Sequence, residues 1–167
     1  MVIKKILIAV VVMITANACT SNKPEQEANT AGEEQPDAIP LYTGLDGEAF
    51  KLEDFKGKAV FLNYWATWCR PCISEMPDIE AARKVLEPEG IEFFVVSDES
   101  IEKIENFRKK NNYGFTYLKL NEDFTSQEVY SLPTTIIYKK DGSVGLKKIG
   151  AMDWDAPQVL ETIRSFN

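Results

Sequence analysis

Histidine is absent from this sequence of 167 residues, and cysteine occurs only three times. Cys69 and Cys72 form a Cys-x-x-Cys pair, and Cys19 lies far from them along the chain. A structural zinc site built on this pair needs further thiol or imidazole ligands, which the chain does not supply. A disulfide that closes so short a loop removes little chain entropy, which argues against a purely structural cross-link. These absences favour redox chemistry for the pair.

Basic residues are in the minority, with 19 Lys and Arg against 26 Asp and Glu and a formal net charge of −7. Proteins that bind nucleic acid use positive charge to neutralise phosphates, so nucleic acid is not expected as a partner. The negative charge is typical of a soluble surface, and a preference for basic substrates is the alternative. The length and the hydrophobic content of 44% fit one globular domain rather than two.

Residues 1–18 have the pattern of an export signal. Lys4 and Lys5 precede an apolar run at residues 6–14, and small residues follow that run. A transmembrane anchor is the alternative, but a spanning helix needs about 20 apolar residues and this run is much shorter. We therefore expect export to the extracytoplasmic side of the cell envelope, such as the periplasm.

Cys19 follows Ala16, Asn17 and Ala18 in a segment that resembles a bacterial lipobox, in which the cysteine is lipidated. Lipoboxes usually carry Leu where Ala16 stands, and the same residues also fit an Ala-x-Ala cleavage site that would leave a free thiol. Lipidation is favoured, because an exposed unpaired thiol is a liability in an oxidising compartment. The composition of residues 19–38, rich in Glu, Gln, Asn, Ala and Pro, predicts a disordered tether.

Residues 39–167 are predicted to form one α/β domain, a central mixed sheet with helices on both faces. Nearly continuous apolar runs indicate buried strands at residues 59–65, 91–97 and 115–120. Turn dipeptides at residues 46–47 and 141–142 indicate an N-terminal β-hairpin and a second hairpin near the C-terminus. Helical spacing predicts helices at 71–86, 101–111 and 154–166, and a short helical piece at 124–130.

The Cys-x-x-Cys pair follows a predicted strand and opens a predicted helix, so Cys69 is expected at the helix N-terminus. Unpaired backbone N–H groups and the helix dipole stabilise a thiolate at that position. We therefore predict that Cys69 is the nucleophile. Cys72 is then the resolving thiol, which attacks the mixed disulfide that Cys69 forms with a substrate.

Residues 61–72 read Phe-Leu-Asn-Tyr-Trp-Ala-Thr-Trp-Cys-Arg-Pro-Cys, and the pattern continues through Glu75 and Pro77. This segment resembles the active-site signature of the TlpA/ResA-like branch of thioredoxin-like proteins. The resemblance implies a thioredoxin-like fold, with the strand-helix insertion of this branch within residues 92–120. It also implies that Pro133 is the cis-proline of the superfamily. The sequence shows no cofactor site.

The resemblance also implies roles for individual residues. Glu75 matches a glutamate that this branch carries near its thiols, and it lies on the helical face of Cys72. Because Asn63 stands where thioredoxin has a buried acid, we expect Glu75 to move the proton of Cys72. The alternative is a solvated acid that only favours the helix dipole. Pro133, which lacks an N–H, is expected to leave the Leu132 backbone open to a substrate strand. The residues predicted to bind substrate are Trp68, Arg70, Leu132 and Thr134.

These features predict a reductase of specific protein disulfides, because the resemblance implies a place in cytochrome c maturation. Apocytochrome c is then a candidate client, and a membrane protein of the CcdA/DsbD type is the expected electron donor. The alternatives are a dithiol oxidant or isomerase of higher potential, a thiol peroxidase of the related AhpC/TSA type, and a tethered adaptor without activity. Peroxidases of that type use one peroxidatic cysteine with Thr and Pro upstream, whereas here Trp68 precedes a dithiol.

Overall fold

The computed structural model describes residues 39–167, so the predicted export signal, the tether and Cys19 lie outside the described residues. One seven-stranded sheet has the order β2-β1-β5-β4-β3-β6-β7. Its strands are β1 (Tyr42–Gly44), β2 (Ala49–Phe50), β3 (Val60–Tyr64), β4 (Glu92–Ser97), β5 (Thr116–Leu120), β6 (Thr134–Tyr138) and β7 (Val144–Ile149). Its helices are α1 (Arg70–Leu86), α2 (Ile101–Asn111) and α3 (Pro157–Arg164), with 3₁₀ helices η1 (Leu52–Phe55), η2 (Glu87–Glu89) and η3 (Phe124–Gln127).

The sheet is mixed, as the sequence predicts. Strands β3, β4 and β5 are parallel neighbours, and the remaining pairs are antiparallel. The hairpin β1–β2 confirms the predicted N-terminal hairpin. Residues 92–120, where the strand-helix insertion is predicted, form β4, α2 and β5. Among residues 39–167, no helix has the length and apolar character needed to cross a bilayer.

Strand β3 is buried along its whole length because side chains cover both faces of the sheet. Alternate residues of a strand point to opposite faces. Phe61 therefore belongs to one core cluster, together with residues of α1, while Leu62 and Tyr64 belong to the other. The same alternation directs Asn63, a polar residue, toward the face that α1 covers. The strand thus places Phe61 and one buried amide on the face of the sheet that α1 covers.

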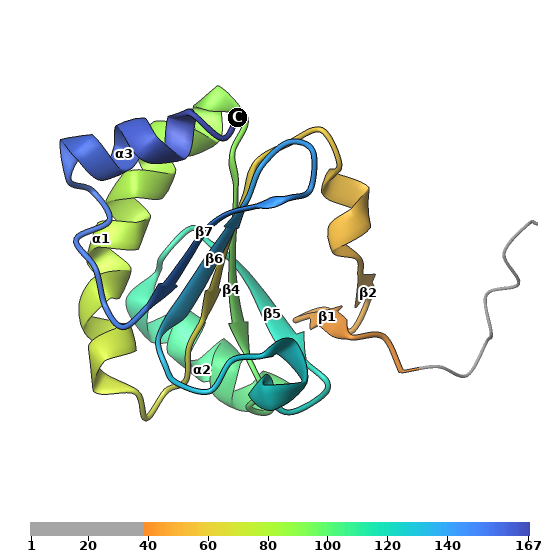
Figure 1. The fold of residues 1–167 in the computed structure, drawn as a ribbon. Coiled ribbons are helices and arrows are strands. Elements are labelled where there is room, and N and C mark those ends of the chain that lie inside the picture. Colours follow the sequence, from red (N-terminus) through yellow and green to blue (C-terminus); the bar gives the residue numbers. More distant parts are fainter. Residues whose placement is uncertain (1–38) are drawn as a thin grey trace, which may run out of the picture. The chain divides into compact units, whose positions relative to one another are not determined.

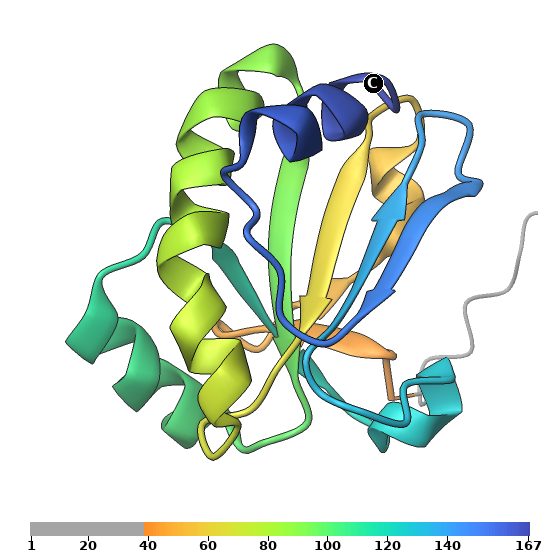
Figure 2. The same cartoon turned by 60° about the vertical axis from the view of Figure 1, so that its left-hand side comes forward.

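Helices cover both faces of the sheet, but unequally. The α-helices of the described residues pack on one face, whereas η1 and η3 contribute side chains to the other. Figure 2 shows α1 and α3 crossing in front of the strands, and Figure 1 shows the η1 segment on the opposite side. The reason is chirality. The crossovers β3–α1–β4 and β4–α2–β5 advance in the same direction along the sheet, so right-handed connections place both helices on the same face.

The observed helices differ from the sequence prediction at two places. The last helix begins at Pro157, a favoured first helical residue, and leaves Trp154 in the preceding loop, where it is fully buried. The short helical piece near residue 124 is the single 3₁₀ turn η3, which ends at Glu128 in a left-handed conformation. Both segments are held by tertiary contacts that apolar spacing does not report.

Candidate redox-active site

Cys69 and Cys72 form a disulfide with a Cα–Cα separation of 5.3 Å. Cys69 is the N-cap of α1, and its Sγ accepts a hydrogen bond of 3.3 Å from the backbone N–H of Cys72. Pro71 occupies the first turn, where its missing N–H is not needed. Cys69 keeps 4% of its surface exposed and Cys72 none, so an approaching molecule meets Cys69 first. The helix N-terminus thus presents one cysteine and buries the other.

Glu75 lies one turn after Cys72 and is also buried, with 2% of its surface exposed. Its Oε2 accepts hydrogen bonds from the Trp154 indole N–H at 2.8 Å and from the Met152 backbone N–H at 3.0 Å. Its Oε1 accepts one from Asn63 Nδ2 at 3.0 Å. Burial raises the pKa of Glu75, and these three hydrogen bonds oppose that rise. Glu75 is therefore a buried acid rather than the solvated acid of the alternative interpretation. Its part in moving the proton of Cys72 stays a prediction.

Asn63 links Glu75 to Thr135 through hydrogen bonds. Its Nδ2 donates to Glu75 and also to Thr135 Oγ1 at 2.8 Å, while its Oδ1 has no hydrogen-bond partner among residues 39–167. A carboxamide has a donor end and an acceptor end, and turning it by half a rotation exchanges them. Asn63 is therefore able to donate to a Glu75 carboxylate or to accept from a protonated Glu75.

Trp68, which directly precedes Cys69, and Leu132 line one hollow of the surface. Trp68 is 69% exposed, and Leu132 is half-buried against the core cluster that contains both cysteines. Both residues line the same hollow, which has a volume of about 340 Å³. Within residues 39–167 the backbone of Leu132 makes no hydrogen bond with another backbone group. Two of the four predicted substrate-binding residues thus share one concave surface.

The other predicted residues of this region lie around that hollow rather than in its lining. The Leu132–Pro133 peptide bond is cis, and the Pro133 carbonyl accepts a hydrogen bond of 2.8 Å from Gly150 N–H. Thr134 is buried, and its hydroxyl donates to the Ser131 carbonyl at 2.6 Å, so this hydroxyl supports the loop. Arg70 is exposed as the first residue of α1. Cys19 lies outside the described residues.

Glu99 is a contributor that the sequence analysis missed. Its side chain is 6% exposed and follows β4. Its Oε2 accepts from the Thr67 backbone N–H at 2.6 Å, and its Oε1 accepts from the Thr67 hydroxyl at 2.8 Å. Thr67 precedes Cys69 by two residues, so Glu99 fixes the segment that leads into the dithiol. A usable signal existed, since the carboxyl ends of the parallel neighbours β3 and β4 meet at one edge of the sheet.

Replacing Glu99 with alanine is expected to lower the free energy of unfolding by about 1 to 3 kcal/mol, because the Thr67 N–H loses its acceptor in a partly buried site. Disulfide exchange should slow as well, since the segment before Cys69 is released. Glu99→Gln is the matched control, because its amide is able to bond both Thr67 groups. Urea unfolding and exchange kinetics measure both effects. An alanine variant with the rate of the unmodified protein would show that Glu99 does not position the dithiol.

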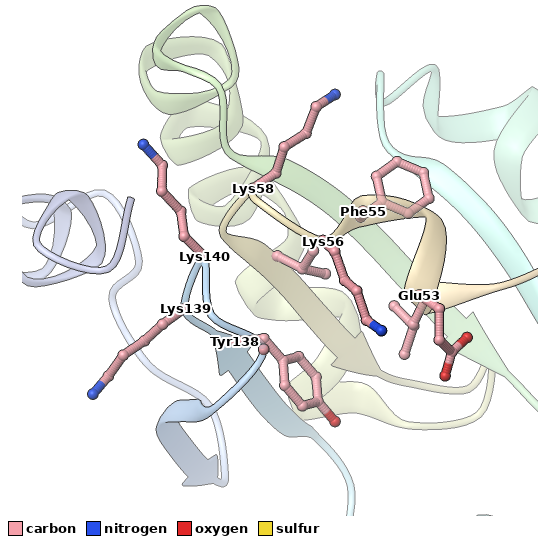
Figure 3. Close-up of a pocket in the computed structure, with 10 residues that line it drawn as sticks. Glu53, Phe55, Lys56, Lys58, Tyr138, Lys139 and Lys140 are labelled. Atoms are coloured by element: carbon pink, nitrogen blue, oxygen red, sulfur yellow. The ribbon is translucent and has the colours of Figure 1, made fainter.

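A second hollow, of about 260 Å³, lies at the other end of β3. Its lining includes Phe55, Val60 and Tyr138 together with four lysines. Figure 3 shows that the side chains of Lys139 and Lys140 extend away from Tyr138. These ammonium groups do not converge on one point, and Val60 is at the end of β3 opposite to the dithiol. This hollow therefore takes no part in the redox site.

Comparisons with known proteins agree with this geometry. Residues 31–147 match the model of the AhpC/TSA family. The thiol-disulfide oxidoreductase ResA of Bacillus thuringiensis subsp. konkukian is 36% identical over 123 residues, which cover 72% of this chain and 70% of that protein. The exposed lipoprotein thioredoxin of Streptococcus pneumoniae has a TM-score of 0.62 and 27% identity, and the match covers 74% of this chain and 96% of that one. A thiol:disulfide interchange protein of Chlorobium tepidum has a TM-score of 0.61 and 23% identity, over 77% of this chain and 99% of that one. These structures confirm the thioredoxin-like fold.

Proposed function

Because this chain belongs to the AhpC/TSA family and is a thiol-disulfide oxidoreductase of the ResA type, we propose that it reduces specific protein disulfides outside the cytoplasm. The observation that carries the proposal is the difference in exposure between the residues at the start of α1. Cys69 lies at the helix N-terminus with a trace of exposed surface, while Cys72 and Glu75 are buried behind it. A buried acid beside the resolving thiol supports turnover through a mixed disulfide, as in thiol-disulfide exchange.

The reaction follows from these positions. The Cys69 thiolate attacks one sulfur of the client disulfide, forms an S–S bond with it and expels the other sulfur as a thiolate, which takes up a proton. Cys72 then gives its proton to the Glu75 carboxylate and attacks Cys69 Sγ, which releases the second client sulfur. That sulfur is protonated in turn. The client gains two electrons and two protons, and Cys69 and Cys72 end as the disulfide of this structure.

The cellular setting is part of the same proposal. The lipobox-like segment that ends at Cys19 and the likeness to a pneumococcal exposed lipoprotein thioredoxin support a lipid anchor on the extracytoplasmic side. In that setting residues 1–18 act as the export signal and residues 19–38 as the tether. The relation to ResA supports a role in cytochrome c maturation, with apocytochrome c as a client and a membrane donor of the CcdA/DsbD type.

The reduction potential of the Cys69–Cys72 pair tests the direction of electron flow. We expect a potential nearer to that of thioredoxin, at about −270 mV, than to that of the oxidant DsbA, at about −120 mV. Equilibration with glutathione or dithiothreitol buffers, followed by thiol alkylation, measures it. A potential close to that of DsbA would overturn the reductase and leave a dithiol oxidant. Peroxide consumption by the reduced protein, at a rate above that of free thiols, would instead favour a peroxidase.

A further inference from the structure

The hollow beside Cys69 carries negative charge as well as aromatic surface. We call it the acidic groove and define it by six of its lining residues, Trp68, Asp98, Asp123, Val129, Tyr130 and Leu132. It lies where β3, β4 and β5 end, since Trp68 follows β3, Asp98 follows β4 and Asp123 follows β5. Figure 2 shows the loop before α1 and the η3 segment at the same end of the sheet. A ligand in this groove is therefore adjacent to the dithiol.

Two carboxylates supply the charge of the groove. Asp98 is half-buried and Asp123 is exposed, and neither forms a salt bridge within residues 39–167. Lys119 donates to the backbone carbonyls of Asp98 and Leu120, at 3.3 and 3.1 Å, rather than to either carboxylate. Burial raises the pKa of Asp98. The negative charges of Glu99 and Asp123 add to that rise, and the positive charge of Lys119 opposes it only in part. A cation that enters the groove therefore relieves the repulsion that remains.

Two aromatic side chains form the rim. Trp68 is 69% exposed and Tyr130 is 80% exposed, although rings of this size are normally well covered. An exposed aromatic face attracts a cation, the more so beside carboxylates that hold it there. Val129, which is buried, provides an apolar floor between them. An aromatic rim, an apolar floor and two acids without a salt bridge among residues 39–167 together fit a side chain with an apolar stem and a cationic head.

We propose that the acidic groove selects client segments that carry Lys or Arg within a few residues of the cysteine that Cys69 attacks. The inference rests on the proposed exchange reaction and names its substrate class. Leu132 connects the two, because its backbone groups are open to a partner strand and its side chain lines the groove. A client strand paired along Leu132 places its neighbouring side chain over the carboxylates. The acidic chain as a whole, at −7, steers such a client toward the site.

Three disulfide-containing peptides, identical except for Lys, Gln or Glu next to the reacting cysteine, test the proposal with the full chain. We expect the reduced protein to reduce the Lys peptide about tenfold faster than the Glu peptide at low salt, with a smaller ratio at high salt. The variant Asp98→Asn/Asp123→Asn should lose this preference. Glu122→Gln is the matched control, because Glu122 is an exposed acid next to Asp123 outside the lining. Equal rates for the three peptides would overturn the proposal that the acidic groove selects basic clients. A preference for the Lys peptide that persists in the double variant would overturn it as well.

Failure of the groove and failure of the reductase have different signatures. If the three peptides are reduced at equal rates, the proposed selectivity of the acidic groove is wrong, whereas the proposed reductase activity is supported. If the protein proves to be an oxidant, the reductase is overturned, and the reduced peptides are mixed with the oxidised protein instead. The groove then predicts the same order, Lys before Gln before Glu, because the client approaches Cys69 in either direction of electron flow.

Discussion

Replacing Cys72 with serine is expected to stop the reaction at the mixed disulfide. Cys69 keeps its position at the start of α1, so it still attacks a client disulfide, but the buried thiol that resolves the adduct is gone. Turnover should fall by at least about a thousandfold, as for the loss of a covalent catalyst elsewhere. A 1:1 covalent complex with the client should accumulate. Mass spectrometry under non-reducing conditions detects that complex, and insulin reduction measures the turnover.

Cys69→Ser is the matched control for this experiment. It should lose turnover to the same degree but form no complex, because Cys72 has no exposed surface and cannot meet a client directly. Adducts of equal yield from both variants would contradict the assignment of Cys69 as the nucleophile. Adduct formation only in Cys69→Ser would reverse the two roles.

The sequence predicts the framework of this site well, because the framework depends on local patterns. The run that forms β3 is apolar except for Asn63, and Pro71 in the first turn marks the start of α1 directly after Cys69. These signals place Cys69 at a helix N-terminus without knowledge of distant contacts. The crossover rule then fixes the face on which α1 lies. A short stretch of sequence therefore locates the dithiol and predicts which of its two cysteines reacts first.

The supporting contacts are not predictable in the same way, because they join residues far apart in the sequence. Trp154 bonds to Glu75 from the loop before α3, and Glu99 bonds to Thr67 from the end of β4. Asp98 and Asp123 share the acidic groove only because β4 and β5 end at the same edge. Neither the periodicity of apolar residues nor the spacing of motifs indicates contacts between such distant residues. The net negative charge of the sequence indicates at most a preference for basic clients. Only the fold shows that two of the acidic residues, Asp98 and Asp123, line a groove next to the dithiol.

Glu75→Gln is expected to separate proton transfer from structure. A glutamine oxygen is able to accept from Trp154 and Met152, and its NH₂ group is able to donate to Asn63 if that amide turns its free Oδ1 toward it. The free energy of unfolding should therefore stay within about 1 kcal/mol of the original value. Resolution of the mixed disulfide should slow by about a hundredfold, because Cys72 loses its proton acceptor. Stopped-flow kinetics of the mixed disulfide measure the rate.

Glu75→Leu is the companion variant, since it removes every acceptor. The N–H groups of Trp154 and Met152 are then left without an acceptor, and Asn63 loses one of its two hydrogen bonds. The free energy of unfolding should therefore fall by about 3 kcal/mol or more. A Gln variant as unstable as the Leu variant would contradict the proposed turn of Asn63. A Gln variant that resolves the mixed disulfide at the original rate would leave Glu75 with a structural role only.

The pH dependence of stability provides an independent check on the same carboxyl. Burial raises the pKa of Glu75 in the folded protein, so between the ordinary carboxyl value and the raised one the folded state holds a proton that the unfolded state releases. The stability contributed by this proton is complete below the ordinary value and is lost as pH rises through the raised pKa. Glu75→Gln cannot titrate, whereas Asp78, the neighbouring acid, remains in both proteins. The stability of the original protein relative to this variant should therefore decline across that window in urea titrations, and a flat difference would show that Glu75 ionises as freely as an exposed acid.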